Sequence, residues 1–279
     1  MRATLIVNPF ATRVSEERVA RVEAELRPAE TLFTRRRGHA VELAAGAAGD
    51  AVWVFGGDGL VNEVLNGLRP GVPLGVVPGG HSNVFARALR LGLHGRTPRP
   101  ISLGRVEGRR FGFASGVGID GDTVRAMETG RRGRDGRRPG DGAYALEVTR
   151  RLLSGYETRL ELTGLGSASI VLVSNGPVYT YAGKVPLSFS PNATWEGGLA
   201  VVAPERMRAR SLPRLLGRMA LGRGLAGASG VLSADDVDRI EVVCDAPLAL
   251  QADGEDLGDV TRAVFEAERE AVSVLTVQP

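Results

Sequence analysis

Residues 55–68 read FGGDGLVNEVLNGL, and they follow an apolar run, AVWVF (residues 51–55), that is typical of a buried strand. This run stops at four turn-forming residues, Gly56-Gly57-Asp58-Gly59. Apolar side chains then recur at helical spacing, at Leu60, Val61, Val64, Leu65 and Leu68. Glycine lets a backbone approach an anion closely, and the first N–H groups of a helix face that anion. The stretch therefore predicts a strand, a phosphate-binding turn and a helix.

Asp58 is the acidic residue of this turn, and its charge repels phosphate. It fits a ligand for the magnesium that accompanies a nucleotide, or a base that accepts a proton from an attacking hydroxyl. The plainer interpretation is a helix cap, which an isolated GGDG would favour. A second unit of the same form weighs against it: PLGVV (residues 73–77), then PGGHSN (78–83), then the helical pattern VFARALRL. Two such turns at one edge of a parallel sheet lie where open α/β sheets bind ligands.

Further motifs occur in a fixed order along the chain. They are Asn8-Pro9, Thr34 with His39-Ala40, residues 56–59 with Asn62-Glu63-Val64 and Asn66-Gly67-Leu68, Pro78-Gly79-Gly80 with Asn83 and Phe85-Ala86-Arg87, Asp253-Gly254-Glu255, and a weaker GVGIDGDTV at 116–124. As an ordered set they resemble the catalytic-domain family of diacylglycerol kinases, which includes bacterial diacylglycerol kinases and sphingosine kinases.

The chain changes character near residue 100. Strand and helix patterns alternate before it, which predicts a parallel sheet flanked by helices. Short alternating segments with frequent glycine follow, which predicts an antiparallel β-sandwich or barrel, interrupted by helical stretches near residues 144–153 and 212–221. The resemblance implies an α/β fold with a NAD kinase-like nucleotide domain (1–100), a β-sandwich lipid-substrate domain (101–267), and a strand at about 268–279 returning to the first domain. It also implies a site in the cleft between the domains.

Composition agrees with an enzyme of a reducing compartment. The single cysteine, Cys244, lies in an apolar stretch (IEVVCDA) and is expected in the core. No apolar run approaches the roughly 20 residues of a membrane span, and MRATLIVNPF is interpreted as a first strand instead of a signal peptide. The net charge of +3 suits weak attraction to anionic lipid but does not favour nucleic acid. We expect a cytoplasmic protein peripheral to the inner face of the membrane; a homodimer stays open.

Basic residues are almost all arginine, with Lys184 the one lysine among 35. Genomic base composition is the plainest reason. The lysine of a P-loop is absent, so phosphate must be held by backbone N–H groups, arginine and metal. Arg35-Arg36-Arg37 fit a phosphate contact and solvated charge equally well. The stretch GRRGRDGRRPGDG (130–142) favours a solvated loop over a contact with anionic headgroups.

The resemblance implies transfer of the γ-phosphoryl group of ATP to a lipid hydroxyl, with ATP and Mg²⁺ as cofactors. The implied nucleotide site comprises Asn8, Thr34, Gly56, Gly57, Asp58, Gly59, Leu60, Asn62, Gly79, Gly80, His81 and Asn83. Asp58 is tied to Mg²⁺ and catalysis. The base is Glu255 in the pattern of bacterial members and Asp58 in that of sphingosine kinases, and both remain open. Asp120 orients the headgroup or supports the base. The plainer interpretations are a loop carboxylate for Asp120 and a hairpin turn for DGE.

Some positions depart from the family pattern. Leu60 and His81 stand where threonine is common, and Val84 where aspartate is common. In TWEGGL (194–199), Gly197 occupies the place of an aspartate that holds a structural magnesium in many bacterial members, with Glu196 beside it. We therefore predict only the Mg²⁺ that arrives with the nucleotide.

The acceptor is the least specified feature. Diacylglycerol, giving phosphatidic acid, is the default, and a sphingoid base, ceramide, phosphatidylglycerol or a polyprenyl alcohol remain alternatives. An apolar slot is expected from PVYTYAG (177–183) or from LPRLLGRMALG (212–222), an amphipathic stretch that lies on a membrane or packs on a sheet. Two other classes stay open: a regulator that binds nucleotide or lipid without turnover, and a kinase of the NAD kinase type.

Overall fold

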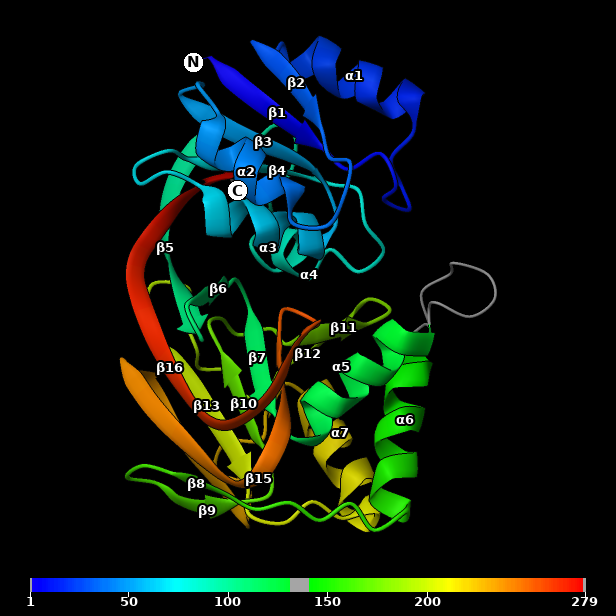
Figure 1. Cartoon of the computed structure of the whole chain (residues 1–279), viewed down its shortest axis with the longest axis vertical. Coiled ribbons are helices and arrows are strands. Elements are labelled where there is room, and N and C mark those ends of the chain that lie inside the picture. The colour runs from blue at the N-terminus through cyan, green and yellow to red at the C-terminus, as the bar shows by residue number, and fades with distance from the viewer. Residues whose placement is uncertain (1, 131–140, 278–279) are drawn as a thin grey trace. The chain divides into compact units, whose positions relative to one another are not determined.

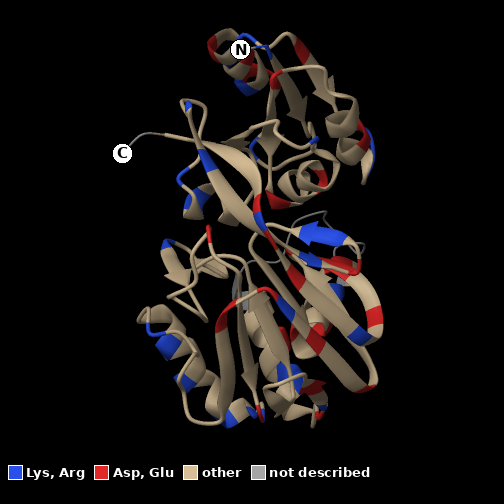
Figure 2. Cartoon of the chain, turned by 90° about the vertical axis from the view of Figure 1, so that its left-hand side faces the viewer, with Lys and Arg blue, Asp and Glu red and all other residues tan. Residues whose placement is uncertain are grey.

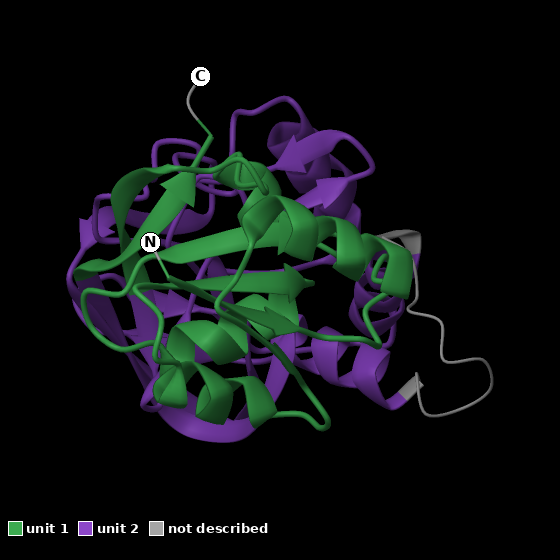
Figure 3. Cartoon of the chain, turned by 90° about the horizontal axis from the view of Figure 1, so that it is seen from above, with its two compact units in different colours: residues 1–103, 269–279 green, residues 104–268 purple. Residues whose placement is uncertain are grey.

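The computed structural model describes residues 2–130 and 141–277, which form two compact units (Figure 3). Unit 1 comprises residues 1–103 and 269–279, and unit 2 comprises residues 104–268. Most of the arginine-rich stretch at 130–142, for which the sequence favours a solvated loop, lies outside the described residues. Each unit is described by itself below.

Unit 1 is built on a parallel sheet in the order β2-β1-β3-β4, continued by the end of β16 (Figure 1). The strands are β1 (Ala3–Val7), β2 (Glu30–Phe33), β3 (Ala51–Gly56), β4 (Leu74–Pro78) and β16 (Glu255–Thr276). In register, Val7 pairs with both Phe33 and Phe55, and Gly56 pairs with Pro78. The carboxyl ends of four strands are therefore aligned at one edge, and the predicted parallel sheet is confirmed.

Four helices accompany this sheet: α1 (Glu16–Leu26), α2 (His39–Gly46), α3 (Asp58–Gly67) and α4 (Val84–Ala88). Ser15 caps α1, since its hydroxyl oxygen accepts the N–H of Arg18 at 3.3 Å. Val19 and Val22 of α1 pack on a core that includes Trp53. The helix expected from VFARALRL is shorter than predicted, because α4 ends at Ala88 and the chain turns through Arg90 at φ 54°.

Unit 2 is built on antiparallel strands in the order β14-β13-β10-β7-β15-β16, with β8, β9, β5 and β6 paired beside them. Their bounds are β5 (Thr97–Val106), β6 (Arg109–Phe111), β7 (Ala114–Val117), β8 (Leu160–Leu162), β9 (Gly166–Ala168), β10 (Val171–Ser174), β13 (Leu199–Pro204), β14 (Val231–Val237) and β15 (Arg239–Ala252). A separate hairpin joins β11 (Thr180–Ala182) and β12 (Val185–Leu187). The predicted antiparallel C-terminal strands are confirmed.

Two strands, β15 and β16, are longer than the short alternating segments expected after residue 100. The residues RIEVVCD (239–245) and PLALQA (247–252) form parts of one 14-residue strand, β15, whose pairing with β16 shifts in register between Val243 and Leu248. The 22-residue β16 likewise joins RAVFEAE and AVSVLTV. A register shift lets one strand continue through a local irregularity, which a sequence pattern shows as a break.

The helices of unit 2 are α5 (Ile119–Gly130), α6 (Asp141–Leu153), α7 (Leu212–Ala220) and a 3₁₀ turn, η1 (Ala209–Ser211). Helices α6 and α7 lie where the sequence predicts them, but α5 was missed. Its first residues, IDGD, are typical of turns. Packing overrides that preference, because a Cβ at Gly121 would stand 2.2 Å from the carbonyl oxygen of Ala249, so the helix lies directly on β15.

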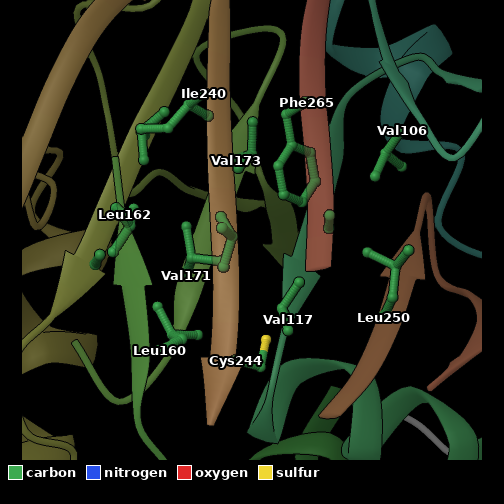
Figure 4. Packing of buried hydrophobic residues seen from close by; sticks show 14 of the residues in the cluster. Val106, Val117, Leu160, Leu162, Val171, Val173, Ile240, Cys244, Leu250 and Phe265 are labelled. Carbon is green, nitrogen blue, oxygen red and sulfur yellow. The ribbon is translucent and has the colours of Figure 1, made fainter. Parts of the chain in front are cut away.

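The core of unit 2 is mostly aliphatic, with Phe111 and Phe265 among its members (Figure 4). Leu160 and Leu162 of β8, Val171 of β10 and Phe265 of β16 converge there. Cys244 is buried with them, which confirms the prediction of a core cysteine, and burial raises the pKa of its thiol. None of the helices described combines the length and the apolar character that a membrane crossing requires.

Candidate functional site

The carboxyl edge of the unit 1 sheet gathers most of the residues that the sequence singles out. Asn8 directly follows β1, Thr34 follows β2, Asp58 follows β3 after one residue, and Gly79 follows β4. Asn8 donates its N–H to the carbonyl of Phe55 at 3.1 Å, and Thr34 donates its N–H to Val7 at 2.9 Å. The strand ends are thus linked to one another where the turns begin.

The two glycine turns pack against each other. The N–H of Gly79 donates to the carbonyl of Gly56 at 2.7 Å. A Cβ at Gly79 would lie 3.0 Å from the Cα of Gly56, and a Cβ at Gly80 would lie 2.5 Å from the Cα of Gly57. The sequence suggests that these glycines let the backbone approach a phosphate closely. In the structure, the absence of side chains at these glycines allows the two turns to pack closely against each other.

Asp58 is the first residue of α3, whose N-cap is Gly57. Its carboxylate holds the start of another helix. Oδ2 accepts the N–H of Val84 at 3.0 Å and Oδ1 accepts the N–H of Phe85 at 3.1 Å, the first two residues of α4. Asp58 therefore does cap a helix, as the plainer interpretation proposed. The helix that it caps is α4, which follows the second glycine turn. These two bonds fix the orientation of the carboxylate at the edge of the sheet.

Asn83 closes the second turn. Its Oδ1 accepts the N–H of Gly80 at 2.8 Å, and its Nδ2 donates to the carbonyl of Gly80 at 2.9 Å. Asn83 has φ 49°, the left-handed region that asparagine tolerates better than most residues. The N–H groups of Gly79 and Gly80 are both used within the two turns. His81 lies exposed at the tip of the second turn.

Helix α3 buries two of the predicted nucleotide residues, Leu60 and Asn62. Leu60 fills the space beside Gly56, where a Cβ would stand 2.6 Å from its Cδ2. Glu63 has a role that sequence reasoning missed. Its Oε1 accepts the N–H of Gly38 at 2.9 Å and its Oε2 the N–H of Ala40 at 3.0 Å, so it fixes the start of α2 as Asp58 fixes α4.

The loop between β2 and α2 carries the arginine run. Arg36 pairs with Glu42 at 2.5 Å, and the N–H of Arg35 donates to Nδ1 of His39 at 3.2 Å. Beside this loop lies an open hollow of about 380 Å³, lined by Thr31, Leu32, Phe33, Arg35, His39 and Leu43. Its lining combines polar and apolar side chains, and Thr34 stands in the chain between the lining residues Phe33 and Arg35.

Unit 2 places Asp120 at the centre of a buried hydrogen-bond network. Asp120 lies in the first turn of α5, and its Oδ1 accepts from the hydroxyls of Tyr144 and Tyr179, the latter at 2.5 Å. Its Oδ2 accepts from Nε2 of Gln251 at 2.6 Å. The plainer interpretation, a loop aspartate holding backbone N–H groups, is wrong, since its partners are side chains. Burial raises the pKa of Asp120, although the three donors act in the opposite direction.

Gln251 links this network to the turn before Glu255. While its Nε2 donates to Asp120, its Oε1 accepts the N–H of Gly254 at 3.0 Å. Asp253 (φ 49°) and Gly254 (φ 77°) form the two-residue turn between paired Ala252 and Glu255. The hairpin predicted as the plainer interpretation of DGE therefore exists, with the positive φ values of a type I′ turn.

Two more contacts hold that hairpin. The carboxylate of Asp253 accepts the N–H groups of Gly112 at 2.6 Å, Phe113 at 2.9 Å and Ala114 at 3.2 Å. Glu255 forms an ion pair with Arg109. Sequence reasoning missed Gln251, Tyr144, Tyr179 and Arg109 as partners. Only Gln251 carried a hint, because it stands two residues before Asp253 in QADGE.

The loop around Gly197 has its own arrangement. Asp236 accepts the N–H of Gly198 at 2.7 Å, and a Cβ at Gly197 would stand 2.8 Å from Oγ1 of Thr194. Across residues 2–130 and 141–277, no three His, Cys, Asp or Glu side chains are grouped to hold a metal ion. The expectation that no structural magnesium is held near Gly197 stays a prediction.

Comparison with known proteins adds an independent line of evidence. Residues 2–106 match the family model of the diacylglycerol kinase catalytic domain. The chain is 35% identical over 139 residues to a diacylglycerol kinase of Bacillus subtilis, a match covering 42% of this chain and 46% of that enzyme. The chain thus spans about half the length of the curated relatives it matches.

The fold is shared with solved structures. A diacylglycerol kinase from Bacillus anthracis superimposes with a TM-score of 0.70 at 20% identity, covering 99% of this chain and 97% of that one. An NAD kinase from Archaeoglobus fulgidus, solved in complex with ATP, superimposes with a TM-score of 0.52 at 12% identity, covering 98% and 93%. At these identities the likeness establishes the α/β fold predicted from the sequence.

Proposed function

We propose that this chain, whose residues 2–106 belong to the diacylglycerol kinase catalytic domain family, is a lipid kinase that transfers the γ-phosphoryl group of ATP to a lipid hydroxyl. Diacylglycerol is the proposed acceptor and phosphatidic acid the product, by similarity to the Bacillus subtilis enzyme. Residues 1–100 with the strand at about 268–279 are the proposed nucleotide domain, and residues 101–267 the proposed lipid domain.

One observation carries this proposal: the carboxylate of Asp58 is fixed where two glycine turns meet. Both of its oxygens accept N–H groups from the start of α4, and the turns pack backbone against backbone beneath it. Phosphoryl transfer depends mainly on positioning and on neutralising charge. A rigid carboxylate at a sheet edge, next to two turns that follow aligned strands, suits that task.

The residues present fit ATP and Mg²⁺. Carboxylate oxygen is a preferred ligand of Mg²⁺, which in nucleotide sites commonly takes one or two protein carboxylates and completes its shell with phosphate and water. When bound, Mg²⁺ neutralises the charge of the phosphates. Asp58 would hold the metal. Asn8, Thr34, His81 and Asn83, with the glycine turns, would surround the nucleotide.

For the proton of the acceptor hydroxyl we propose Glu255 as the base. The two oxygens of Asp58 are engaged by backbone N–H groups, whereas Glu255 is held by the side chain of Arg109. The hydroxyl oxygen forms its bond to the γ-phosphorus as the bond to ADP breaks, and its proton passes to the carboxylate of Glu255. Asp120 acts through Gln251, which orients the turn in front of Glu255.

The test is turnover of radiolabelled ATP and Mg²⁺ with lipid acceptors in mixed micelles. Asp58→Ala and Glu255→Gln are each expected to lower kcat by at least about a thousandfold. Ser15→Ala is the matched control, because it removes the N-cap of α1 at a cost of about 1 kcal/mol while leaving the sheet edge intact. Its turnover is expected to stay within about twofold of the native protein.

The lipid panel includes diacylglycerol, a sphingoid base, ceramide and phosphatidylglycerol, and NAD serves as the soluble acceptor. A chloroform-soluble labelled product that both carboxylate variants lose supports the proposal, and its mobility identifies the acceptor. Phosphorylation of NAD alone would overturn it in favour of an NAD kinase. ATP binding with no labelled product from any acceptor would overturn it in favour of a regulator.

A further inference from the structure

Helix α7 and its flanks form a surface of one charge sign. From Arg206 to Ala234 the chain has six arginines and neither aspartate nor glutamate. The inner side of α7 is occupied, because Leu215 and Met219 are buried against a core that includes Phe189 and Val202. The helix is therefore anchored in unit 2 by one side, and its other side faces solvent.

That outer side is apolar. Leu216 is 36% exposed, and Leu221, just past the end of the helix, is 70% exposed. Around the helix axis, the positions that lie between these two leucines are Pro213, Gly217 and Ala220, and none of them carries a charge. An exposed apolar strip on a helix that already buries its other side has no role in packing its own unit.

Most of the arginines around this strip are exposed. Arg218 is the exception, since its Nε donates to the carbonyl of Gly224 at 2.9 Å and so closes the end of α7. The remaining five are exposed, and within the described parts of the chain none of them forms an ion pair. They are Arg206, Arg208, Arg210, Arg214 and Arg223.

The strands of the same unit show the opposite pattern. Arg239 pairs with Glu266 at 2.7 Å and Arg262 pairs with Glu241 at 2.6 Å, and Figure 2 shows acidic and basic residues interspersed along the strands. Uncompensated charge is therefore not a general property of unit 2. It is concentrated in the segment of residues 206–223, which carries these five exposed arginines together with Leu216 and Leu221 and which we call the α7 face.

Helix α6 adds apolar surface nearby, since η1 packs against it. Leu146 and Leu153 of α6 are 70% and 74% exposed, and they stand seven residues apart on one side of the helix with Arg150 between them. This side also combines exposed leucine with an exposed arginine, but here Arg150 is paired with Glu147 at 3.7 Å.

We propose that the α7 face binds the surface of an anionic phospholipid bilayer. Arginines contact headgroup phosphates while Leu216 and Leu221 enter the boundary with the acyl chains, as in amphipathic helices that lie on membranes. Nucleic acid fits less well, because residues 205–234 contain no aromatic side chain on which a base would stack. The inference rests on the proposed function only in that a lipid acceptor requires contact with a bilayer.

The test is sedimentation with vesicles of phosphatidylcholine, with and without phosphatidylglycerol, in the absence of nucleotide. One triple variant changes Arg210, Arg214 and Arg223 to Gln. The matched control changes Arg159, Arg239 and Arg262 to Gln, which removes the same charge from exposed positions elsewhere in unit 2. We expect binding only to the anionic vesicles, weakened about a hundredfold in the first variant and within about threefold of native in the control.

Leu221→Ser gives a second, charge-neutral variant at an exposed position, which is expected to weaken binding about tenfold without altering the melting temperature. Equal losses in the two arginine variants would overturn the proposal, since binding would then follow net charge alone. Absence of vesicle binding by the native protein would overturn it too.

Turnover separates this inference from the proposed function. If the native protein binds anionic vesicles but phosphorylates no lipid, the proposed function is refuted, while the proposal that the α7 face binds bilayers is retained. If the native protein phosphorylates micellar lipid without binding vesicles, the proposal for the α7 face is refuted, while the proposed lipid kinase function is retained. With both correct, the triple α7 variant keeps its rate on micelles and loses it on bilayers.

Discussion

At the scale of single residues, three carboxylates accept hydrogen bonds from backbone N–H groups of other segments and so fix the positions of those segments. Asp58 holds the start of α4, Glu63 holds the start of α2, and Asp253 holds residues 112–114. Each bond from an N–H to an ionised carboxylate is stronger than a neutral hydrogen bond. Acidic residues next to glycine turns therefore have structural roles here besides any role in chemistry.

The packing of the two glycine turns predicts that Gly80→Ala destabilises the protein. Its Cβ would stand 2.5 Å from the Cα of Gly57, a backbone atom with little freedom to move. We expect a loss of about 1–3 kcal/mol in the free energy of unfolding, measured by urea denaturation. Gly46→Ala is the control, since its Cβ meets nothing within 4 Å. A loss as large in that control would contradict the packing argument.

Because Asp120 is buried, we expect the stability of the protein to depend on pH. Burial raises the pKa of Asp120, so the folded state holds its proton more tightly than the unfolded state. The contribution of Asp120 to the free energy of unfolding is fully present below the ordinary pKa of an aspartate. It is lost as the pH rises through the raised pKa of Asp120 in the folded protein. Tyr144 and Tyr179 face it as neutral groups, because burial raises the pKa of both hydroxyls well above its ordinary value.

We therefore expect the free energy of unfolding of the native protein to fall between mildly acidic and neutral pH relative to that of Asp120→Asn. Urea denaturation of both proteins across this range measures the difference. Parallel curves for the two proteins would show that Asp120 titrates as it does in the unfolded chain.

At the scale of elements, the β15–β16 hairpin carries Asp253 and Glu255 and is linked to Asp120 through Gln251. Gln251 faces Asp120 on one side and the turn at Gly254 on the other, and Glu255 begins the next strand. Alternation of side chains along a strand would not reveal this link, because it depends on α5 lying directly on β15. The hairpin itself was predictable, since Asp-Gly is a strong turn pattern.

Asp253→Ala tests how firmly the hairpin is held. The substitution removes an acceptor of three backbone N–H groups and places alanine at φ 49°. We expect a loss of about 2–5 kcal/mol in the free energy of unfolding. Asp253→Asn keeps an acceptor oxygen and tolerates this φ, so it is expected to lose about half as much. If the two variants lost the same amount, the bonds to residues 112–114 would carry little energy.

At the scale of the whole molecule, unit 1 is assembled from both ends of the chain. Residues 269–279 belong to it, Val274 pairs with Leu74 of β4, and Leu275 joins the core formed by Leu5, Trp53 and Phe55. The parallel sheet thus gains its last strand from a segment that follows all of unit 2 in sequence. We therefore expect the stability of unit 1 to depend on that segment.

Leu275→Ala is expected to lower the free energy of unfolding by about 2–5 kcal/mol, because it opens a cavity in this core. Val277→Ala, at a position 41% exposed, is the control and is expected to change it by less than about 0.5 kcal/mol. Hydrogen exchange should show that Leu275→Ala weakens the protection of β4 and β3. Unchanged protection in those strands would refute the role of the C-terminal segment.

Sequence by itself established the local units of this protein. Period and composition located the strands and helices of unit 1, the glycine turns, the Asp-Gly hairpin and the buried Cys244, because each depends on neighbours close along the chain. The motif order was enough to indicate the family whose model residues 2–106 match. The antiparallel character of the later strands followed from their short spacing and frequent glycine.

Tertiary structure decided the partners. Asp58 serves α4, 26 residues away, and Asp120 meets Gln251, 131 residues away. Helix α5 forms against its turn-like sequence because it packs on β15, and the long strands β15 and β16 continue where the pattern breaks. Such contacts join segments distant in the chain, and their free energy comes from burial and hydrogen bonds that no local pattern encodes.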